Sequence, residues 1–164
     1  FKESLLENIR AVRPEASRDE VLAAAHAAQC DDILEKLPQG LDTVVGTKGV
    51  YLSGGEQQRI ALARAILKNA PIVVLDEATA FADPENEHQI QKAFEALTRN
   101  KTVLMIAHRL STVQDADNII VLSDGKIAEQ GNHRDLLQKN GVYAAMWADY
   151  QRSAQWKVGK EAAV

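Results

Sequence analysis

Apolar residues recur at helical spacing through the first 70 residues of the chain. Ser17, with Glu20 three positions later, has the pattern of a capping box, and apolar residues follow it three to four positions apart. A second, short helix is predicted over residues 31–37, and residues 40–49 read as a loop. A longer helix should then run to about Lys68. Its apolar positions are Ile60, Leu62, Ala63, Ile66 and Leu67.

The pattern changes at Pro71, where short apolar runs replace the helical spacing. Residues 72–75 and 102–106 are continuous apolar segments, typical of parallel strands that are buried on both faces. A helix should lie between them, because Asp83 is a good N-cap residue and Pro84 suits the first helical position. A strand–helix–strand unit of this length predicts an α/β fold.

Two more strands are predicted near the end of the chain, over residues 118–122 and 126–130. They flank a turn in which Gly125 can adopt a positive φ without a steric penalty, so the simplest arrangement is a hairpin. Residues 134–138 and 142–156 then read as helices.

Composition narrows the classes of function. The 164 residues carry a net charge of −4 with no basic block, which argues against nucleic acid as a partner. Cys30 is the only cysteine, so the chain cannot form an internal disulfide, and its Ala-rich surroundings indicate a small buried side chain. No apolar run approaches the roughly 20 residues that span a bilayer, so we expect any membrane part to lie elsewhere.

Three short motifs indicate chemistry. In the signature segment, Leu52–Arg59, Ser53 and Glu56 could simply form a capping box, but two glycines between them would also let a phosphate approach the helix N–H groups closely. The predicted strand 72–75 leads into two carboxylates, which could be ordinary loop residues or a catalytic pair at the carboxyl end of a sheet. A histidine, His108, follows the next strand.

These motifs together resemble one family. The sequences LSGGEQQR at 52–59, IVVLDE at 72–77 and AHRLST at 107–112 are similar to the C-terminal part of the nucleotide-binding domain of an exporter-type ABC transporter. The resemblance implies a partial P-loop NTPase fold of class α/β: a helical subdomain and the remaining strands of a mainly parallel sheet. No G-x-x-x-x-G-K-[ST] motif is present, and the Q-loop is absent too. We therefore expect a fragment whose sheet lacks the P-loop strand.

The resemblance also divides the chain and assigns roles to its residues. Residues 1–69 would be the helical subdomain with the signature helix, 70–141 the C-terminal part of the ATPase core, and 142–164 a C-terminal helix and tail. The residues implied to contact ATP across a head-to-tail dimer are Ser53, Gly54, Gly55, Glu56 and Asp83. Those implied in catalysis are Glu77 as the base for the attacking water, His108 at the γ-phosphate and Asp76, which would order Mg²⁺ through water.

Several positions depart from the family pattern. The common residue at position 56 is Gln, which puts a ribose contact from Glu56 in doubt. In the D-loop, Ala80 and Phe81 stand where Ser and Leu are usual, although Asp83 is retained. In the segment similar to the exporter X-loop, residues 43–49, Val44 replaces the usual acidic residue.

The implied function is ATP hydrolysis coupled to solute movement, with ATP and Mg²⁺ as cofactors. The implied partners are a second nucleotide-binding domain, identical or related, and a transmembrane domain, and the implied location is the cytoplasmic face of the cell membrane. Without a P-loop the isolated chain should be inactive. A chromosome-maintenance ATPase of the SMC type, which also carries LSGGE, is the alternative, and an interaction module with lost chemistry is a third.

The missing strand has a structural consequence. In this family the P-loop strand lies between the strand that leads to His108 and the strand predicted over residues 118–122. The chain should compensate for unpaired strand edges by re-pairing its own strands, by swapping with a second copy or by aggregating.

Overall fold

The computed structural model describes residues 3–46, 49–76, 84–107 and 110–161. The chain divides into two compact units, Phe1–Leu104 and Met105–Val164, each with its own hydrophobic core. In the part of the chain that the structure describes, no helix is both long enough and apolar enough to cross a bilayer.

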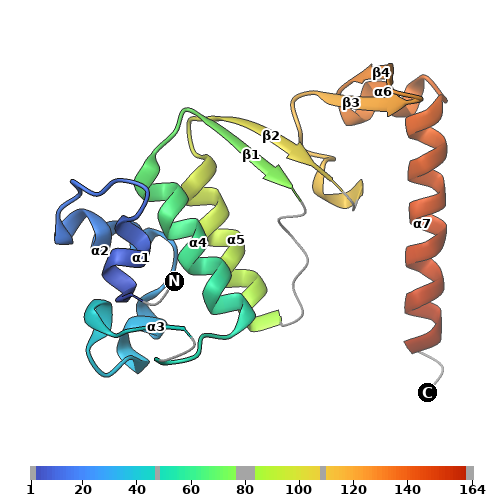
Figure 1. Cartoon of the computed structure of the whole chain (residues 1–164). Helices are drawn as coiled ribbons and strands as arrows, with labels where there is room; N and C mark the ends of the chain where they lie inside the picture. The colour runs from blue at the N-terminus through green and yellow to red at the C-terminus, as the bar shows by residue number, and fades with distance from the viewer. Residues whose placement is uncertain (1–2, 47–48, 77–83, 108–109, 162–164) are drawn as a thin grey trace. The chain divides into compact units, whose positions relative to one another are not determined.

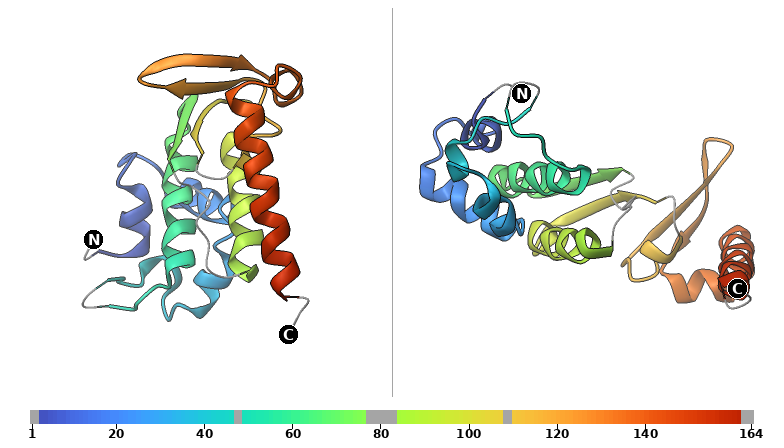
Figure 2. Two further views of the ribbon diagram at one scale, coloured as in Figure 1. Left: turned by 90° about the vertical axis from the view of Figure 1, so that its right-hand side faces the viewer. Right: turned by 90° about the horizontal axis from the view of Figure 1, so that it is seen from below.

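Unit 1 is mainly helical (Figure 1). Its helices are α1 (Leu5–Arg10), α2 (Arg18–Ala27), α3 (Asp31–Lys36), the 3₁₀ turn η1 (Gly40–Asp42), α4 (Gly54–Lys68) and α5 (Pro84–Thr98). The two views in Figure 2 show α4 and α5 side by side, and buried residues of α1, α2, α4 and α5 share one core.

Local sequence signals set most helix boundaries. The predicted capping box at the start of α2 is present, because the Ser17 Oγ and the Glu20 carboxylate each accept a hydrogen bond from the other residue's backbone N–H. Helix α4 ends where predicted: Asn69 takes the left-handed conformation and donates its N–H to carbonyls of the last turn. The predicted loop 40–49 is not wholly irregular, since η1 occupies its first three residues.

Strands β1 (Ile72–Asp76) and β2 (Thr102–Ile106) form a two-stranded sheet in which both arrows run in the same direction (Figure 1). The prediction that both faces of these strands are buried is wrong. Val73 packs against the helical core and Leu75 is 8% exposed, whereas Ile72 and Val74 are each 61% exposed. Among the described residues of unit 1, helices cover one face of this sheet only.

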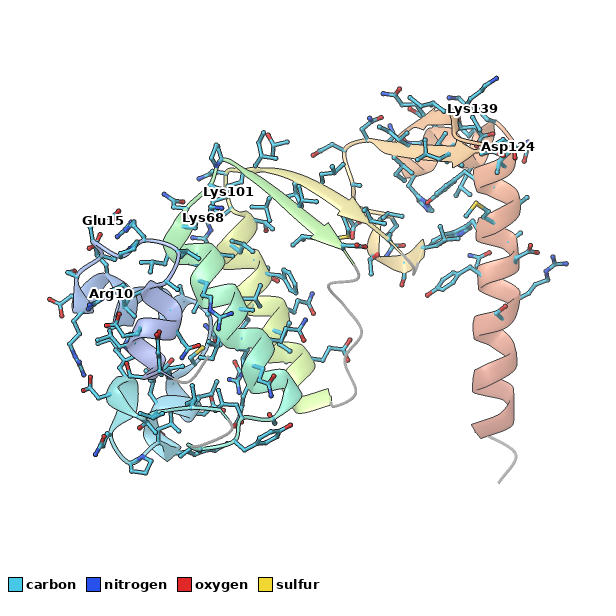
Figure 3. All side chains as sticks on the ribbon, viewed as in Figure 1. Arg10, Glu15, Lys68, Lys101, Asp124 and Lys139 are labelled. Atoms are coloured by element: carbon cyan, nitrogen blue, oxygen red, sulfur yellow. The ribbon has the colours of Figure 1, made fainter. Side chains whose placement is uncertain are left out.

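Unit 2 contains the predicted hairpin, β3 (Ile119–Ser123) and β4 (Lys126–Gly131), which pair in antiparallel fashion. Ser123 pairs with Lys126 around a two-residue turn, in which Asp124 (Figure 3) has φ 50° and Gly125 has φ 73°. Positive φ at both central residues is typical of the type I′ turn. The remaining elements are η2 (Leu110–Thr112), α6 (His133–Gln138) and α7 (Val142–Glu161), and the unit's buried residues are Ile119, Val121, Leu136 and Tyr143.

Strand pairing bears on the predicted gap in the sheet. Within the described residues β2 pairs with β1 only, and β3 pairs with β4 only. Among these residues, therefore, no re-pairing of the chain's own strands refills the gap. Swapping with a second copy and aggregation stay predictions.

Candidate functional site

The start of α4 is organised by a capping box within the signature segment. Ser53 is the N-cap residue with extended backbone, and its Oγ accepts the Glu56 N–H at 3.2 Å. In return the Glu56 Oε2 accepts the Ser53 N–H at 2.8 Å. One residue before the cap, the Leu52 carbonyl accepts the Gln57 side-chain amide at 2.7 Å. The local sequence alone specifies these contacts, because all the partners lie within five residues of one another.

The capping box leaves two backbone donors at the start of α4. The first four N–H groups of a helix have no partner from a preceding turn. Here Glu56 donates to the Ser53 Oγ, and Gln57 donates to the Ser53 carbonyl at 2.9 Å. The N–H groups of Gly54 and Gly55 are therefore available to an anion, and the helix dipole adds about half a positive charge at this end. The Ser53 hydroxyl accepts in the capping box and can still donate its own proton.

Gly54 is not required by the fold. A Cβ at this position would meet no other atom within 4 Å, and its φ lies outside the left-handed region. Glycine at a helical position costs up to about 1 kcal/mol relative to alanine. The absence of a side chain here consequently calls for a reason outside the chain's own packing, and close approach by a ligand supplies one.

A buried arginine ties α4 to the preceding helices. The Arg59 side chain is 2% exposed and forms a two-pronged ion pair with Asp32 of α3, at 2.6 and 2.9 Å. It also donates to the Gln29 carbonyl, while its Nε has no partner. The hydrogen bond from Arg59 holds the pKa of Asp32 below its ordinary value. Sequence reasoning gave Arg59 no role, although a charged residue beside the apolar stripe of a predicted helix was a usable signal.

Glu56 lies at this same junction. Its side chain is 17% exposed, and the Lys36 Nζ of α3 lies 3.6 Å from its Oε1. Both carboxylate oxygens of Glu56 are thus engaged within the chain, one by the Ser53 N–H and one by Lys36.

Asp76 is the last residue of β1, and it is exposed. Asp76 thus lies at the end of β1 away from Lys68 and Lys101, which precede the first residues of β1 and β2 and are labelled in Figure 3. The predicted catalytic residues Glu77 and His108 and the predicted ATP contact Asp83 lie outside the described residues. Among the residues that are described, no hydrogen bond or ion pair joins Asp76 to Ser53, Gly54, Gly55 or Glu56.

The residues at this strand end fit only a Mg²⁺ ion that keeps most of its water ligands. Within the described ranges, no group of three or more His, Cys, Asp or Glu side chains could enclose a metal ion. Mg²⁺ retains several waters and is usually held by one or two carboxylates and by substrate phosphates. A single exposed carboxylate at a strand end, as at Asp76, is compatible with that arrangement.

Comparisons with known proteins decide the family. A family profile described as "ABC transporter" matches residues 2–80. The chain is 52% identical over 149 residues to an ATP-dependent lipid A-core flippase of Haemophilus ducreyi, covering 90% of the chain and 26% of the relative. It is 49% identical over 156 residues to the ABC transporter ATM1 of Toxoplasma gondii, covering 94% of the chain and 14% of that protein. The chain belongs to the ABC transporter family.

A solved ABC exporter agrees with this assignment. A bacterial Atm1-family exporter with ATP bound matches with a TM-score of 0.78 and 49% sequence identity, covering 91% of this chain and 26% of that one. The expected fold class, a partial ABC ATPase domain with helices and a parallel sheet, is therefore confirmed. The chain spans about a quarter of the length of the flippases it matches. The named relatives are all transporters, which favours the transporter interpretation over the chromosome-maintenance one.

Proposed function

We propose that this chain is part of an ATP-hydrolysing domain of an ABC exporter, and that the start of α4 contacts the γ-phosphate of an ATP held by a partner domain. The free N–H groups of Gly54 and Gly55 and the free proton of the Ser53 hydroxyl supply three donors on one helix end. Gly54 carries the proposal, because the fold gives no reason for a glycine there and a closely approaching phosphate does.

The remaining catalytic roles follow from the motifs. Asp76 would help to hold Mg²⁺ through water, and the ion would supply charge neutralisation at the phosphates. Glu77 would accept the proton of the attacking water, and His108 would donate a hydrogen bond to the γ-phosphate. Asp83 would contact the nucleotide of the partner domain. Glu77, Asp83 and His108 rest on the sequence alone.

The proposed assembly has two kinds of partner. One is a second nucleotide-binding domain, identical or related, arranged head to tail, whose bound ATP the start of α4 would contact. The other is the transmembrane domain of the same transporter, which would place the chain at the cytoplasmic face of a membrane. The flippases and the ATM1 protein named above are similar proteins, and their names supply no substrate for this one.

The test uses the transporter that contains this chain. Gly54→Ala should strongly reduce ATP turnover while leaving the melting temperature unchanged or slightly raised, because the added methyl has room within the fold and alanine favours helix. Gly125→Ala is the matched control: its φ of 73° disfavours a side chain, so it should lower stability without acting on the site. Turnover of Gly54→Ala equal to that of the unmodified protein would refute the phosphate contact.

A second substitution tests the chemistry. Glu77→Gln should lower the rate of ATP hydrolysis by about 10²–10⁴-fold and leave ATP binding intact, because it removes a base and keeps the shape of the side chain. Steady-state phosphate release and nucleotide binding measured on one preparation separate the two effects. A rate within about threefold of the unmodified protein would contradict the role of Glu77.

A further inference from the structure

Lys36 of α3 lies between two carboxylates. Its Nζ is 3.6 Å from the Glu56 Oε1 of α4 and 3.9 Å from the Asp32 Oδ2 of its own helix. Its side chain is 68% exposed, so the lysine is not part of the core. Asp32 already has a partner, because Arg59 donates to both of its oxygens. Lys36 therefore compensates mainly the charge of Glu56.

The negative charge of Glu56 is unfavourable at a helix end that faces a phosphate. Its carboxylate accepts the Ser53 N–H, one residue from the free N–H of Gly54 and two residues from that of Gly55. A glutamine would accept the same hydrogen bond through its neutral carbonyl oxygen, because the capping box requires only an acceptor. The negative charge of Glu56 instead repels a phosphate at short range, in opposition to the helix dipole.

We propose that Lys36 is a positioning residue for the signature segment: it offsets the charge of Glu56 and holds that carboxylate in the capping box. This inference rests on the proposed function, since it concerns the anion that the start of α4 receives. An exposed ion pair contributes little to folding stability, so the effect of Lys36 should appear in anion binding.

The experiment titrates the ¹⁵N-labelled full chain, at a concentration at which it is monomeric, with inorganic pyrophosphate, a probe with phosphate groups and no base or ribose. The amide signals of Gly54 and Gly55 are followed by NMR. Lys36→Met should weaken binding by about two- to fivefold, and Lys36→Arg should retain it. The control Lys92→Met removes one positive charge from the exposed surface of α5 and should leave the titration unchanged.

The decisive result is a rescue. Glu56→Gln in the Lys36→Met background should restore pyrophosphate binding, because no carboxylate charge is left to offset, whereas a purely structural loss at Lys36 would not be repaired. Equal binding by Lys36→Met and the unmodified chain, failure of the rescue, or absence of any response at Gly54 and Gly55 would each overturn the inference. The proposed function is tested by ATP turnover in Gly54→Ala and Glu77→Gln, so the two can fail separately.

Discussion

Two arginine–aspartate pairs with the same geometry differ in burial. Arg59 is 2% exposed and pairs with Asp32, whose side chain is 47% exposed. Arg18 pairs with Asp42 at 2.8 and 2.7 Å, and both of these side chains are more than half exposed. Solvent screens the second pair, while the Arg59 guanidinium depends on Asp32 for compensation of a buried charge. Burial of one partner thus decides which pair stabilises the fold.

Asp32→Asn should destabilise the chain by about 1–3 kcal/mol, because it leaves the Arg59 charge buried without a counter-charge. The half-exposure of Asp32 places the effect at the lower end of that range. Asp42→Asn is the matched control and should cause little measurable change. Urea unfolding of the two variants checks the difference, and equal midpoints would contradict the dependence of Arg59 on Asp32.

The same pair predicts a dependence on pH. The hydrogen bond from Arg59 lowers the pKa of Asp32 from its ordinary 3.8, so the folded state binds this proton less readily than the unfolded state. The stabilisation is present above pH 3.8 and is lost as the pH falls through the lower folded-state pKa. The stability difference between the unmodified chain and Asp32→Asn should therefore shrink on acidification below that value.

At the scale of elements, α7 is capped by a side chain from another element. The Glu129 carboxylate, on β4, accepts the N–H groups of Val142 at 2.8 Å and Tyr143 at 2.9 Å. A Cβ at Gly141 would lie 1.7 Å from the Glu129 Oε1, so only glycine allows this approach. The cap joins the hairpin to α7, and Tyr143 completes the junction with its hydroxyl 2.7 Å from the His133 Nδ1.

Gly141→Ala should expel Glu129 from this cap and destabilise unit 2 by about 1–3 kcal/mol, since two helix N–H groups lose their acceptor. Glu129→Gln should cost less, because one amide oxygen can still accept. Hydrogen exchange at the Val142 and Tyr143 amides measures both effects. As a control, Asp149→Asn removes an exposed ion pair later in the same helix and should leave these amides unchanged. Unaltered protection in Gly141→Ala would refute the cap.

At the scale of the whole molecule, the main feature of the described residues is exposed apolar surface on the strands. Ile72 and Val74 on β1 are 61% exposed, and Leu104 and Ile106 on β2 are 55% and 51% exposed. The hairpin of unit 2 also has apolar residues in solvent, Ile120, Leu122 and Ile127. Exposed apolar strands with open edges are sites of association with other chains.

The isolated chain should therefore self-associate in a concentration-dependent manner. Leu104→Lys together with Ile106→Lys should reduce this association, because charges on a strand oppose edge pairing. Val12→Lys is the control, since Val12 is a single apolar residue, 39% exposed, in the turn that follows α1. Sedimentation velocity over a range of concentrations distinguishes the variants. A monomeric unmodified chain at all concentrations would contradict the prediction.

Features that depend on a few neighbouring residues could be predicted from the sequence. The capping boxes at Ser17 and Ser53, the α/β alternation and the Asp124–Gly125 turn each need one short spacing and one backbone conformation. The signature segment was identified by its resemblance to the ABC family, since its local pattern alone equally fits a capping box. Its contact with a phosphate remains a proposal.

Only the tertiary structure decided the contacts between distant residues. Arg59 and Asp32 are 27 residues apart, and Glu129 lies 13 residues before the N–H of Val142. Neither pair follows from periodicity, because each depends on how two elements pack and which side chains lose water there. The exposure of one face of β1 and β2 likewise depends on the tertiary structure. Their apolar runs predict burial on both sides, but burial requires a second layer, and a strand's own sequence does not determine whether that layer is present.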